Sequence, residues 1–330
     1  MPGSSARSAV PTFVPGGFAP PGPPAPSLSL RSAGSLAVLA RFVTAVTVVL
    51  SAAPARAQGD PPVGVRAAGM AGAFTAVADD ATAAVWNPAG LASGSFVSFA
   101  IDGNHFNGQS TLFVGFGSPP LAVTYLRSAT AEVSNGRNML VTHNFGVSLV
   151  QSLGDTGLAV GTTLKYVRGI TSAEAVPSRS SNAFDADVGV LFSRGIGQIG
   201  LAVRNAAEPS FAAADGSGGE IRLDRKVRAG ASLHVNERTT VAGDVEFTKA
   251  TTLSGVWRDA AIGVETHPLG PLWLRSGVHW NTAGGQTGAA PIAAFGASYT
   301  IRGALMAEGQ ASLGSAHGNR GWGLGLRFSF

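Results

Sequence analysis

The stretch V-R-A-A-G-M-A-G-A-F-T-A-V-A-D-D-A-T-A-A-V-W-N-P-A-G-L-A, residues 65–92, differs from everything that follows it. It is rich in small residues and compatible with helix. Asp79 or Asp80 can cap a short helix that runs through Val85. This helix should break at Asn87, because a residue that precedes a proline disfavours the helical conformation. The stretch therefore predicts a short helical segment that ends in a turn.

From Ser95 to Phe330 the chain reads as one strand after another, and the last ten residues show the pattern best. Large apolar side chains alternate there with glycine, arginine and serine. The apolar positions are Trp322, Leu324, Leu326, Phe328 and Phe330. Such alternation is typical of a barrel strand with one face toward lipid and one toward a lumen. The same reading predicts fourteen strands, at 96–102, 110–117, 120–128, 138–150, 157–168, 183–194, 196–205, 226–235, 239–248, 258–266, 271–280, 292–302, 303–312 and 321–330. An even number of strands is usual in single-chain outer-membrane barrels.

The connections between these strands alternate between short turns and longer loops, another habit of outer-membrane barrels. The long loops are expected at 169–182, 206–225 and 281–291. One short connection, Gly195-Ile196-Gly197-Gln198-Ile199-Gly200, matches the glycine pattern of a dinucleotide-binding loop. That pattern requires a helix after it, whereas a strand follows here, so it predicts a hairpin turn.

A large soluble β-sandwich would also show alternation. Against it, charged side chains occupy the inward positions of many strands, where a packed soluble core would not tolerate them. Charged residues make up only 13% of the chain, about half of the usual share. The chain also ends on an amphipathic strand with an aromatic residue, as barrels inserted by the outer-membrane machinery do. We therefore predict an all-β fold, a transmembrane antiparallel β-barrel of about 14 strands, and we assign Phe328 and Phe330 to its C-terminal assembly signal.

The first 57 residues carry the pattern of an export signal. Arg41 precedes a short apolar run, and Ala55-Arg56-Ala57 is a cleavage site of the A-x-A type, so the mature chain is expected to begin at Gln58. Residues 1–30 are rich in Pro, Ser and Gly, and they are either a long n-region or precede the true translation start. Without the four arginines of this leader, 19 basic residues balance 19 acidic ones, which leaves no electrostatic case for nucleic-acid binding.

No pattern in the sequence indicates an enzyme, a metal site or a cofactor. The chain has no cysteine and six histidines, none of which pair with a metal-motif spacing. Alternation places His234 and His279 toward the lumen. Trp257, Trp273 and Trp322 fall near strand ends, as does Trp280, which suggests an aromatic girdle at the membrane interfaces.

The opening stretch resembles the N-terminal signature of the FadL and PorV/PorQ superfamily of outer-membrane barrels. The matching residues are Arg66 to Phe74, Ala78-Asp79-Asp80 and Trp86-Asn87-Pro88-Ala89-Gly90-Leu91. The resemblance implies a fourteen-stranded barrel whose N-terminal segment folds into the lumen as a hatch. The expected hatch motif is Asp79, Asp80, Trp86, Asn87, Pro88, Ala89 and Gly90, and the expected parts are a signal peptide with its extension at 1–57, a hatch at 58–94 and a barrel at 95–330.

Two functions follow from this resemblance. FadL-type members pass fatty acids and other hydrophobic molecules sideways through the barrel wall, which implies transport across the outer membrane of a Gram-negative-type bacterium. PorV-type members bind the signal domains of exported proteins, so the alternative is a component of type IX-like secretion. The expected partners are outer-membrane lipids, the barrel-insertion machinery, and either a hydrophobic ligand or a secreted protein cargo. Lumen-facing positions carry mostly Gly, Ser, Thr and charged residues, which leans away from a purely apolar tunnel.

Overall fold

The computed structural model describes residues 62–330 except 107, 134–137, 174–175, 215–218, 253–254, 284–290 and 315–319. All described residues belong to one compact unit, Phe42–Phe330. The predicted signal peptide at 1–57 and its cleavage site lie outside the described residues. Within the described part of the chain, no helix is long and apolar enough to cross a membrane.

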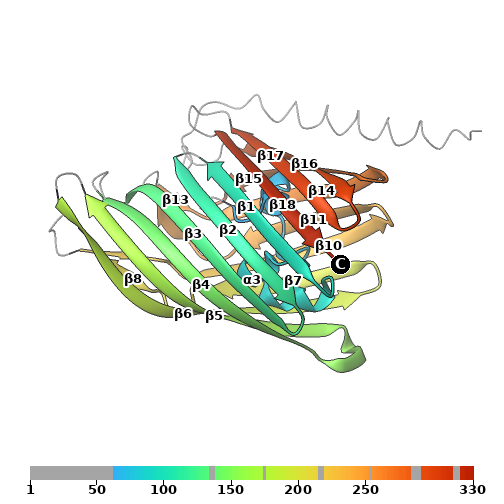
Figure 1. Cartoon of the computed structure of the whole chain (residues 1–330), viewed down its shortest axis with the longest axis horizontal. Helices are drawn as coiled ribbons and strands as arrows, with labels where there is room; N and C mark the ends of the chain where they lie inside the picture. The colour runs from blue at the N-terminus through green and yellow to red at the C-terminus, as the bar shows by residue number, and fades with distance from the viewer. Residues whose placement is uncertain are drawn as a thin grey trace, which may run out of the picture. The chain divides into compact units, whose positions relative to one another are not determined.

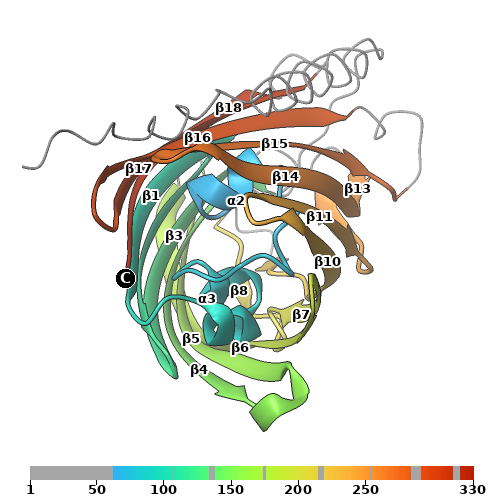
Figure 2. The ribbon, with the colours of Figure 1, turned by 90° about the vertical axis from the view of Figure 1, so that its right-hand side faces the viewer.

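Fourteen of the described strands form a closed antiparallel barrel, as Figures 1 and 2 show. They are β1 (Ser98–Phe106), β2 (Gln109–Ser118), β3 (Leu121–Val133), β4 (Asn138–Ser152), β5 (Leu158–Ala173), β6 (Val176–Arg194), β7 (Gly197–Arg204), β10 (Lys226–Asn236), β11 (Thr239–Glu246), β14 (Asp259–Leu269), β15 (Leu272–Asn281), β16 (Ile292–Arg302), β17 (Leu305–Gly314) and β18 (Arg320–Ser329). Each strand pairs with its neighbour along the chain, and β1 pairs with β18 to close the ring. Each overlaps one predicted segment, so the predicted all-β barrel and its strand count are confirmed.

The period-two alternation sets the two faces of the wall. On β18, Trp322 is 57% exposed on the outer face. Arg327 is buried on the inner face of the same strand. Two of the predicted girdle positions are wrong, because Trp257 is only 6% exposed and both Trp257 and Trp273 line cavities inside the barrel. Alternation places Trp273 on the inner face with Arg275, whereas Trp257 lies in the three-residue strand β13 (Gly255–Trp257), which is too short to show a period.

Short turns join the strands at one rim of the barrel, which also carries the ends of the first and last strands, Ser98 and Ser329. The glycine-rich run at 195–200 is one of these turns, with Gly195 at φ 58°, in the left-handed region. The predicted hairpin is therefore confirmed. The predicted loop at 169–182 is wrong, because β5 and β6 continue pairing as far as Ala173 and Val176. Polar side chains occupy both faces there, so the sequence loses its alternation although the backbone pairing continues.

Two small sheets lie within the longer connections. The connection between β7 and β10 contains β8 (Ser210–Ala212) and β9 (Glu220–Arg222), and the one between β11 and β14 contains β12 (Ala250–Thr252) and β13 (Gly255–Trp257). Phe211 of β8 packs on Gly169 of the wall, in a buried cluster with Leu140 and Val167. The β8–β9 connection therefore folds back inside the barrel, as Figure 2 shows.

Residues 62–94, the luminal segment, lie inside the barrel (Figure 2). They form α2 (Val65–Gly69), α3 (Ala83–Trp86) and the 3-10 helix η1 (Pro88–Ser93). Helix α2 contacts β15 to β18 and β1, whereas η1 contacts β4 to β6 on another part of the wall. The luminal segment therefore bridges separate parts of the wall.

The predicted helix within this segment is observed in a shorter form. The predicted cap is wrong, because Thr82 and neither Asp79 nor Asp80 is the N-cap residue; Asp80 instead accepts hydrogen bonds from the backbone and side chain of Thr82. The helix ends at Trp86, before Asn87-Pro88, as the sequence predicts. The chain then starts a second helical turn, in which the side chain of Asn87 accepts a hydrogen bond from Ala89 N. The proline that ends the first helix thus begins the next, a favourable position for a residue without a backbone N–H.

Candidate functional site

Glycines of the barrel wall let the luminal segment approach it closely. A Cβ on Gly189 would overlap the side chain of Asn87, and a Cβ on Gly161 would overlap the backbone of Pro88. Similar close contacts join further wall glycines to the segment, namely Gly200 to Thr75, and Gly263 and Gly277 to Met70. Because glycine has no side chain, these sites let the backbone of the segment, or at Gly189 the side chain of Asn87, lie directly against the backbone of the wall. The fit therefore depends on glycine at specific wall positions.

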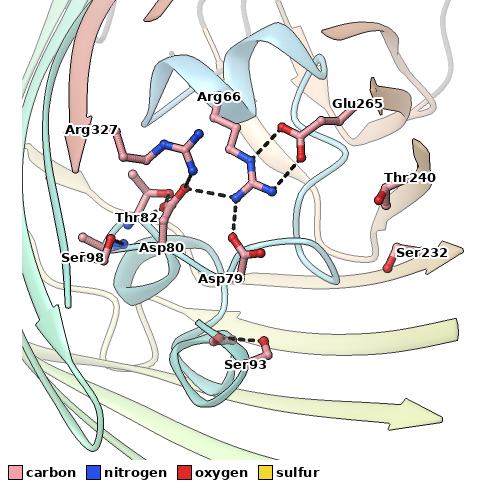
Figure 3. Close-up of polar contacts among 12 residues, drawn as sticks. Arg66, Asp79, Asp80, Thr82, Ser93, Ser98, Ser232, Thr240, Glu265 and Arg327 are labelled. Carbon is pink, nitrogen blue, oxygen red and sulfur yellow. Dashed lines mark hydrogen bonds and ion pairs between the residues drawn. The ribbon is translucent and has the colours of Figure 1, made fainter. Parts of the chain in front are cut away.

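Arg66, on α2, is at the centre of the polar contacts of the segment (Figure 3). It donates two hydrogen bonds to Glu265 of β14, at 2.8 and 2.7 Å. It also forms ion pairs with Asp79 and with Asp80, the latter at 3.2 Å. Burial alone would lower the pKa of Arg66, but the carboxylates of Asp79 and Glu265 outweigh it and raise this pKa well above its ordinary value. Arg66 therefore joins the luminal segment to the wall as a permanent cation.

The wall extends this contact into a larger set of charges, which we name the central ion-pair network. Arg275 lies 2.5 Å from Glu265, and Arg327 lies 3.0 Å from Glu308. Arg327 also reaches Asp80 of the luminal segment at 3.5 Å. The members of the network are Arg66, Asp79, Asp80, Glu265, Arg275, Glu308 and Arg327. All except Asp79 are largely buried, so these charges depend on one another for compensation.

A second set of contacts holds the turn of the segment at Phe74 and Thr75. Asp244 of β11 accepts hydrogen bonds from Phe74 N at 3.1 Å, from Thr75 N at 2.9 Å and from the Thr75 hydroxyl at 2.6 Å. Arg228 of β10 donates to Gly72 O at 3.1 Å. Its guanidinium also lies 5.3 Å from the centre of the Trp86 ring. A wall carboxylate thus satisfies two backbone N–H groups of the segment that its own short helices leave unpaired.

The residues of the predicted hatch motif lie in two parts of the luminal segment, before helix α3 and from its last residue onward. Asp79 and Asp80 belong to the central ion-pair network. Trp86 donates from Nε1 to Val63 O at 2.7 Å and meets Phe74 edge-on, with ring centres 5.9 Å apart.

Asn87 is fully buried and belongs to the second part. Its amide donates to Thr75 O at 2.9 Å and to Val190 O of the wall at 3.1 Å. Pro88 and Ala89 are buried in the turn that follows, and a Cβ on Gly90 would overlap the carbonyl of Ala78. These residues therefore shape the luminal segment, while a hatch role for them stays a prediction.

Phe328 and Phe330 lie apart from this site. Phe328 pairs with Phe99 of β1 and Leu305 of β17. Phe330 exchanges two backbone hydrogen bonds with Val97, at 2.8 and 2.9 Å, and its side chain is 77% exposed. Both residues take part in the seam that closes the barrel, and their role in assembly stays a prediction.

The wall residues Glu265, Arg275 and Glu308 were not singled out from the sequence, although alternation placed charged residues such as Arg327 inside. The sequence signal for them is a charge at a lumen-facing position in a chain with few charges. Which of these charges meet cannot be read from alternation, because Arg66 and Glu265 are 199 positions apart. Within the described residues, no group of three His, Cys, Asp or Glu side chains could hold a metal ion.

Cavities flank the luminal segment. The aromatic cavity is lined by Trp86 together with Phe106, Trp257 and His279, and by the charged Arg228, Asp259 and Glu246. The hydroxyl cavity is lined by Thr111, Thr124, Ser128, Thr130, Thr142 and Asn144 of the wall. A third cavity contains Arg66 and Asp79 together with residues next to the short turns, such as Asn236 and Arg238. The first two include strand ends at the other rim, so the luminal segment lies between them and the third cavity.

Solved structures share this fold at low sequence identity. The monoaromatic hydrocarbon channel CymD superposes with a TM-score of 0.61 and 12% identity, covering 82% of this chain and 98% of that one. A FadL homologue from Pseudomonas aeruginosa has a TM-score of 0.57 and 12% identity, covering 83% and 100% of the two chains. The Pseudomonas putida toluene transporter TodX has a TM-score of 0.56 and 11% identity, covering 83% and 98%. No protein-family model matches the sequence, and no curated protein matches it. The likeness confirms that the chain has a FadL-like barrel fold.

Proposed function

We propose that this FadL-like barrel is an outer-membrane channel for small hydrophobic molecules, and that its luminal segment is a hatch. The structural neighbours include a monoaromatic hydrocarbon channel and a toluene transporter. The outer face of the barrel supports a membrane location, because large apolar side chains are exposed there on successive strands, where lipid would cover them. The rim of short turns would then face the periplasm.

The proposed function assigns a role to each part of the chain. We propose that residues 1–57 are a cleaved signal peptide, that 58–94 are the hatch and that 95–330 are the barrel. Outer-membrane lipids and the barrel-insertion machinery would be its partners. The channel needs no enzymatic step and no cofactor to work in this way.

One observation carries the proposal. The luminal segment lies between the cavities of the two rims, and side chains from several strands hold it there. A molecule that enters the aromatic cavity must pass this segment or leave through the wall. Asn87, Asp80 and Arg66 are buried contacts that fix the closed position.

The test is uptake into vesicles with lipopolysaccharide in the outer leaflet, which slows the passive entry of small hydrocarbons. The full-length mature protein is expected to speed toluene entry over protein-free vesicles, and deletion of residues 65–92 should raise the rate further. Equal entry with and without protein would contradict a channel. Protein-dependent entry that the deletion leaves unchanged would contradict only the hatch.

The alternative is a PorV/PorQ-like component of type IX-like secretion. The polar lumen favours it, since buried ion pairs and hydroxyls line the wall where a hydrocarbon path would be apolar. This function predicts that the protein co-purifies with an exported protein or with secretion subunits from its native membrane. Purification without such partners, combined with protein-dependent toluene entry, would decide for the channel.

A further inference from the structure

The aromatic cavity and the hydroxyl cavity are adjacent, since Val63 and Arg204 line both. In the aromatic cavity, the ring of His279 lies 6.4 Å from Phe106 and 6.3 Å from Trp257. Trp86 of the luminal segment also lines this space. The cavity thus offers aromatic side chains to a flat apolar ring.

The hydroxyl cavity has a different chemistry. Thr111 of β2 lies directly opposite Ser128 of β3, and Ser128 lies opposite Thr142 of β4. Directly opposed residues on one face are about 5 Å apart. The three side chains therefore form a row of hydroxyls across three neighbouring strands, and Thr124 and Thr130 add two more to the same cavity.

Three buried polar atoms at these cavities have no hydrogen-bond partner among the described residues. They are the hydroxyl oxygen of Thr111, in the row, Nε of Arg204, at the junction, and Oε1 of Gln310, in the aromatic cavity. A buried donor or acceptor without a partner costs free energy, and so such groups are normally satisfied. A hydroxyl group of a bound molecule could satisfy both a donor and an acceptor at these cavities.

Two cations at the cavities, Lys165 and Arg228, are already paired with carboxylates, which favours a neutral molecule. Lys165 lines the hydroxyl cavity, but Asp185 and Asp187 each lie 2.6 Å from its ammonium group. Arg228 in the aromatic cavity is paired with Asp259. Hydroxyl groups, which both donate and accept, suit the row of hydroxyls, and a hydroxyl oxygen can also accept from Nε of Arg204.

We propose that the substrate class of this channel is neutral hydroxylated aromatic compounds, with the ring in the aromatic cavity and its hydroxyls at the row and at Arg204. This assignment rests on the proposed function, because it names what the channel carries. A plain hydrocarbon would fill the aromatic cavity and leave the hydroxyl cavity unused.

The test compares ligands with one carbon skeleton: toluene, 4-methylphenol, 4-methylcatechol and, as the charged member, 4-methylbenzoate. Binding to the mature protein in amphipol is measured by equilibrium dialysis against protein-free amphipol, which corrects for partition. The affinity is expected to rise from toluene to 4-methylphenol to 4-methylcatechol. Thr111→Val and Arg204→Met should each lower the affinity for 4-methylcatechol by about two- to tenfold, which corresponds to one buried hydrogen bond, and should lower the affinity for toluene less.

Matched controls are Thr300→Val, a threonine outside all three cavities, and Arg194→Met, an exposed arginine at a hairpin turn. Neither should change the order of affinities. Toluene binding as tightly as the hydroxylated ligands would overturn the assignment and leave the channel standing. Tightest binding of 4-methylbenzoate would show that charge decides and would also overturn it. Failure of all four to bind would count against both the substrate class and the proposed channel.

Discussion

Arg66 couples the luminal segment to the barrel more directly than any other charged side chain of that segment that the structure describes. Its planar guanidinium reaches two carboxylates of the segment and both oxygens of Glu265 in the wall. A lysine could not replace it, because a single ammonium lacks the fork that matches a carboxylate at two points. The buried position also matters, as Arg66 is only 7% exposed and its ion pairs are little weakened by solvent.

The first prediction concerns the substitution Arg66→Met. Loss of one partner from a buried ion pair costs roughly 3–5 kcal/mol. The low end applies here, because Glu265 keeps Arg275 and Asp80 keeps Arg327. Detachment of the segment should therefore become about a hundredfold more frequent, which follows from about 3 kcal/mol.

The absence of native cysteine makes this measurable. In a Val77→Cys background, the substituted position is 8% exposed beside the third cavity, and a soluble maleimide should react chiefly after detachment. Arg66→Met should speed labelling about a hundredfold, whereas Arg194→Met, an exposed arginine, should not. Equal labelling rates in the two variants would show that Arg66 does not hold the segment.

The second prediction concerns pH and Asp80. Burial alone would raise the pKa of Asp80, but Arg327 and Arg66 outweigh it and hold this pKa below its ordinary value. A carboxyl whose folded pKa is lowered stabilises the attached segment above its unfolded pKa, about 3.9, and that stabilisation is lost as pH falls through the folded pKa. Labelling of the Val77→Cys thiol, corrected for thiol reactivity, should be constant from pH 7 to about pH 5 and rise only below about pH 4. Asp80→Asn should reduce the acid-dependent part, since Glu265 also pairs with Arg66, and persistence of the full acid response in that variant would exclude Asp80 as its source.

Among the elements, the 3-10 helix η1 shows how the segment and the wall depend on each other. The helix packs on β4, β5 and β6, where glycines leave room for its backbone. Asn87, at its start, uses its amide to join the segment to Val190 O of β6. The wall glycines thus leave room for this segment, and a side chain introduced at one of them would overlap the segment.

The third prediction is that Gly189→Ala displaces the luminal segment without unfolding the barrel. The new Cβ would overlap the side chain of Asn87, while strands tolerate alanine in place of glycine. Single-channel conductance in planar bilayers should increase. Gly270→Ala is the control, because a Cβ there meets nothing within 4 Å. Unchanged conductance in a correctly folded Gly189→Ala barrel would mean that this contact does not determine closure.

The strands were predictable from sequence, whereas the interior was only partly so. Alternation identified all fourteen barrel strands because the outer face of each strand carries apolar side chains and the inner face carries small or polar ones. Alternation failed at the paired ends of β5 and β6 next to Ala173 and Val176, where polar side chains occupy both faces of β6. It could not detect β8 and β9, since three residues are too few to show a period.

The luminal segment was found by its motif, and its contacts were not. The break at Asn87-Pro88 follows from local chemistry and was predicted. The ion pair of Arg66 with Glu265 depends on which strands face each other across the lumen, and that is a property of the closed ring. Local patterns therefore predict elements here, and only the closed barrel decides which charges pair.

At the scale of the whole molecule, closure of the barrel pairs the first and last strands, which lie far apart in the sequence. The β1–β18 ladder runs from Ser98↔Ser329 to Phe106↔Gly321. Phe330 extends it through two backbone hydrogen bonds with Val97. The seam closes the ring, so we expect its end residue to affect assembly more than final stability.

The fourth prediction is that deletion of Phe330 lowers the amount of inserted barrel in cells severalfold. Two lost backbone hydrogen bonds cost about 2 kcal/mol at most, since each contributes about 1 kcal/mol, and this is too little to unfold a closed barrel. The same variant refolded in detergent should therefore form the barrel, as judged by heat-dependent gel mobility. Phe184→Ser is the control, because Phe184 is equally exposed, at 79%, but lies within β6, away from the seam. A similar loss of insertion in both variants would show that exposed aromatic surface in general matters, whereas a loss confined to the deletion would assign the effect to the C-terminal position.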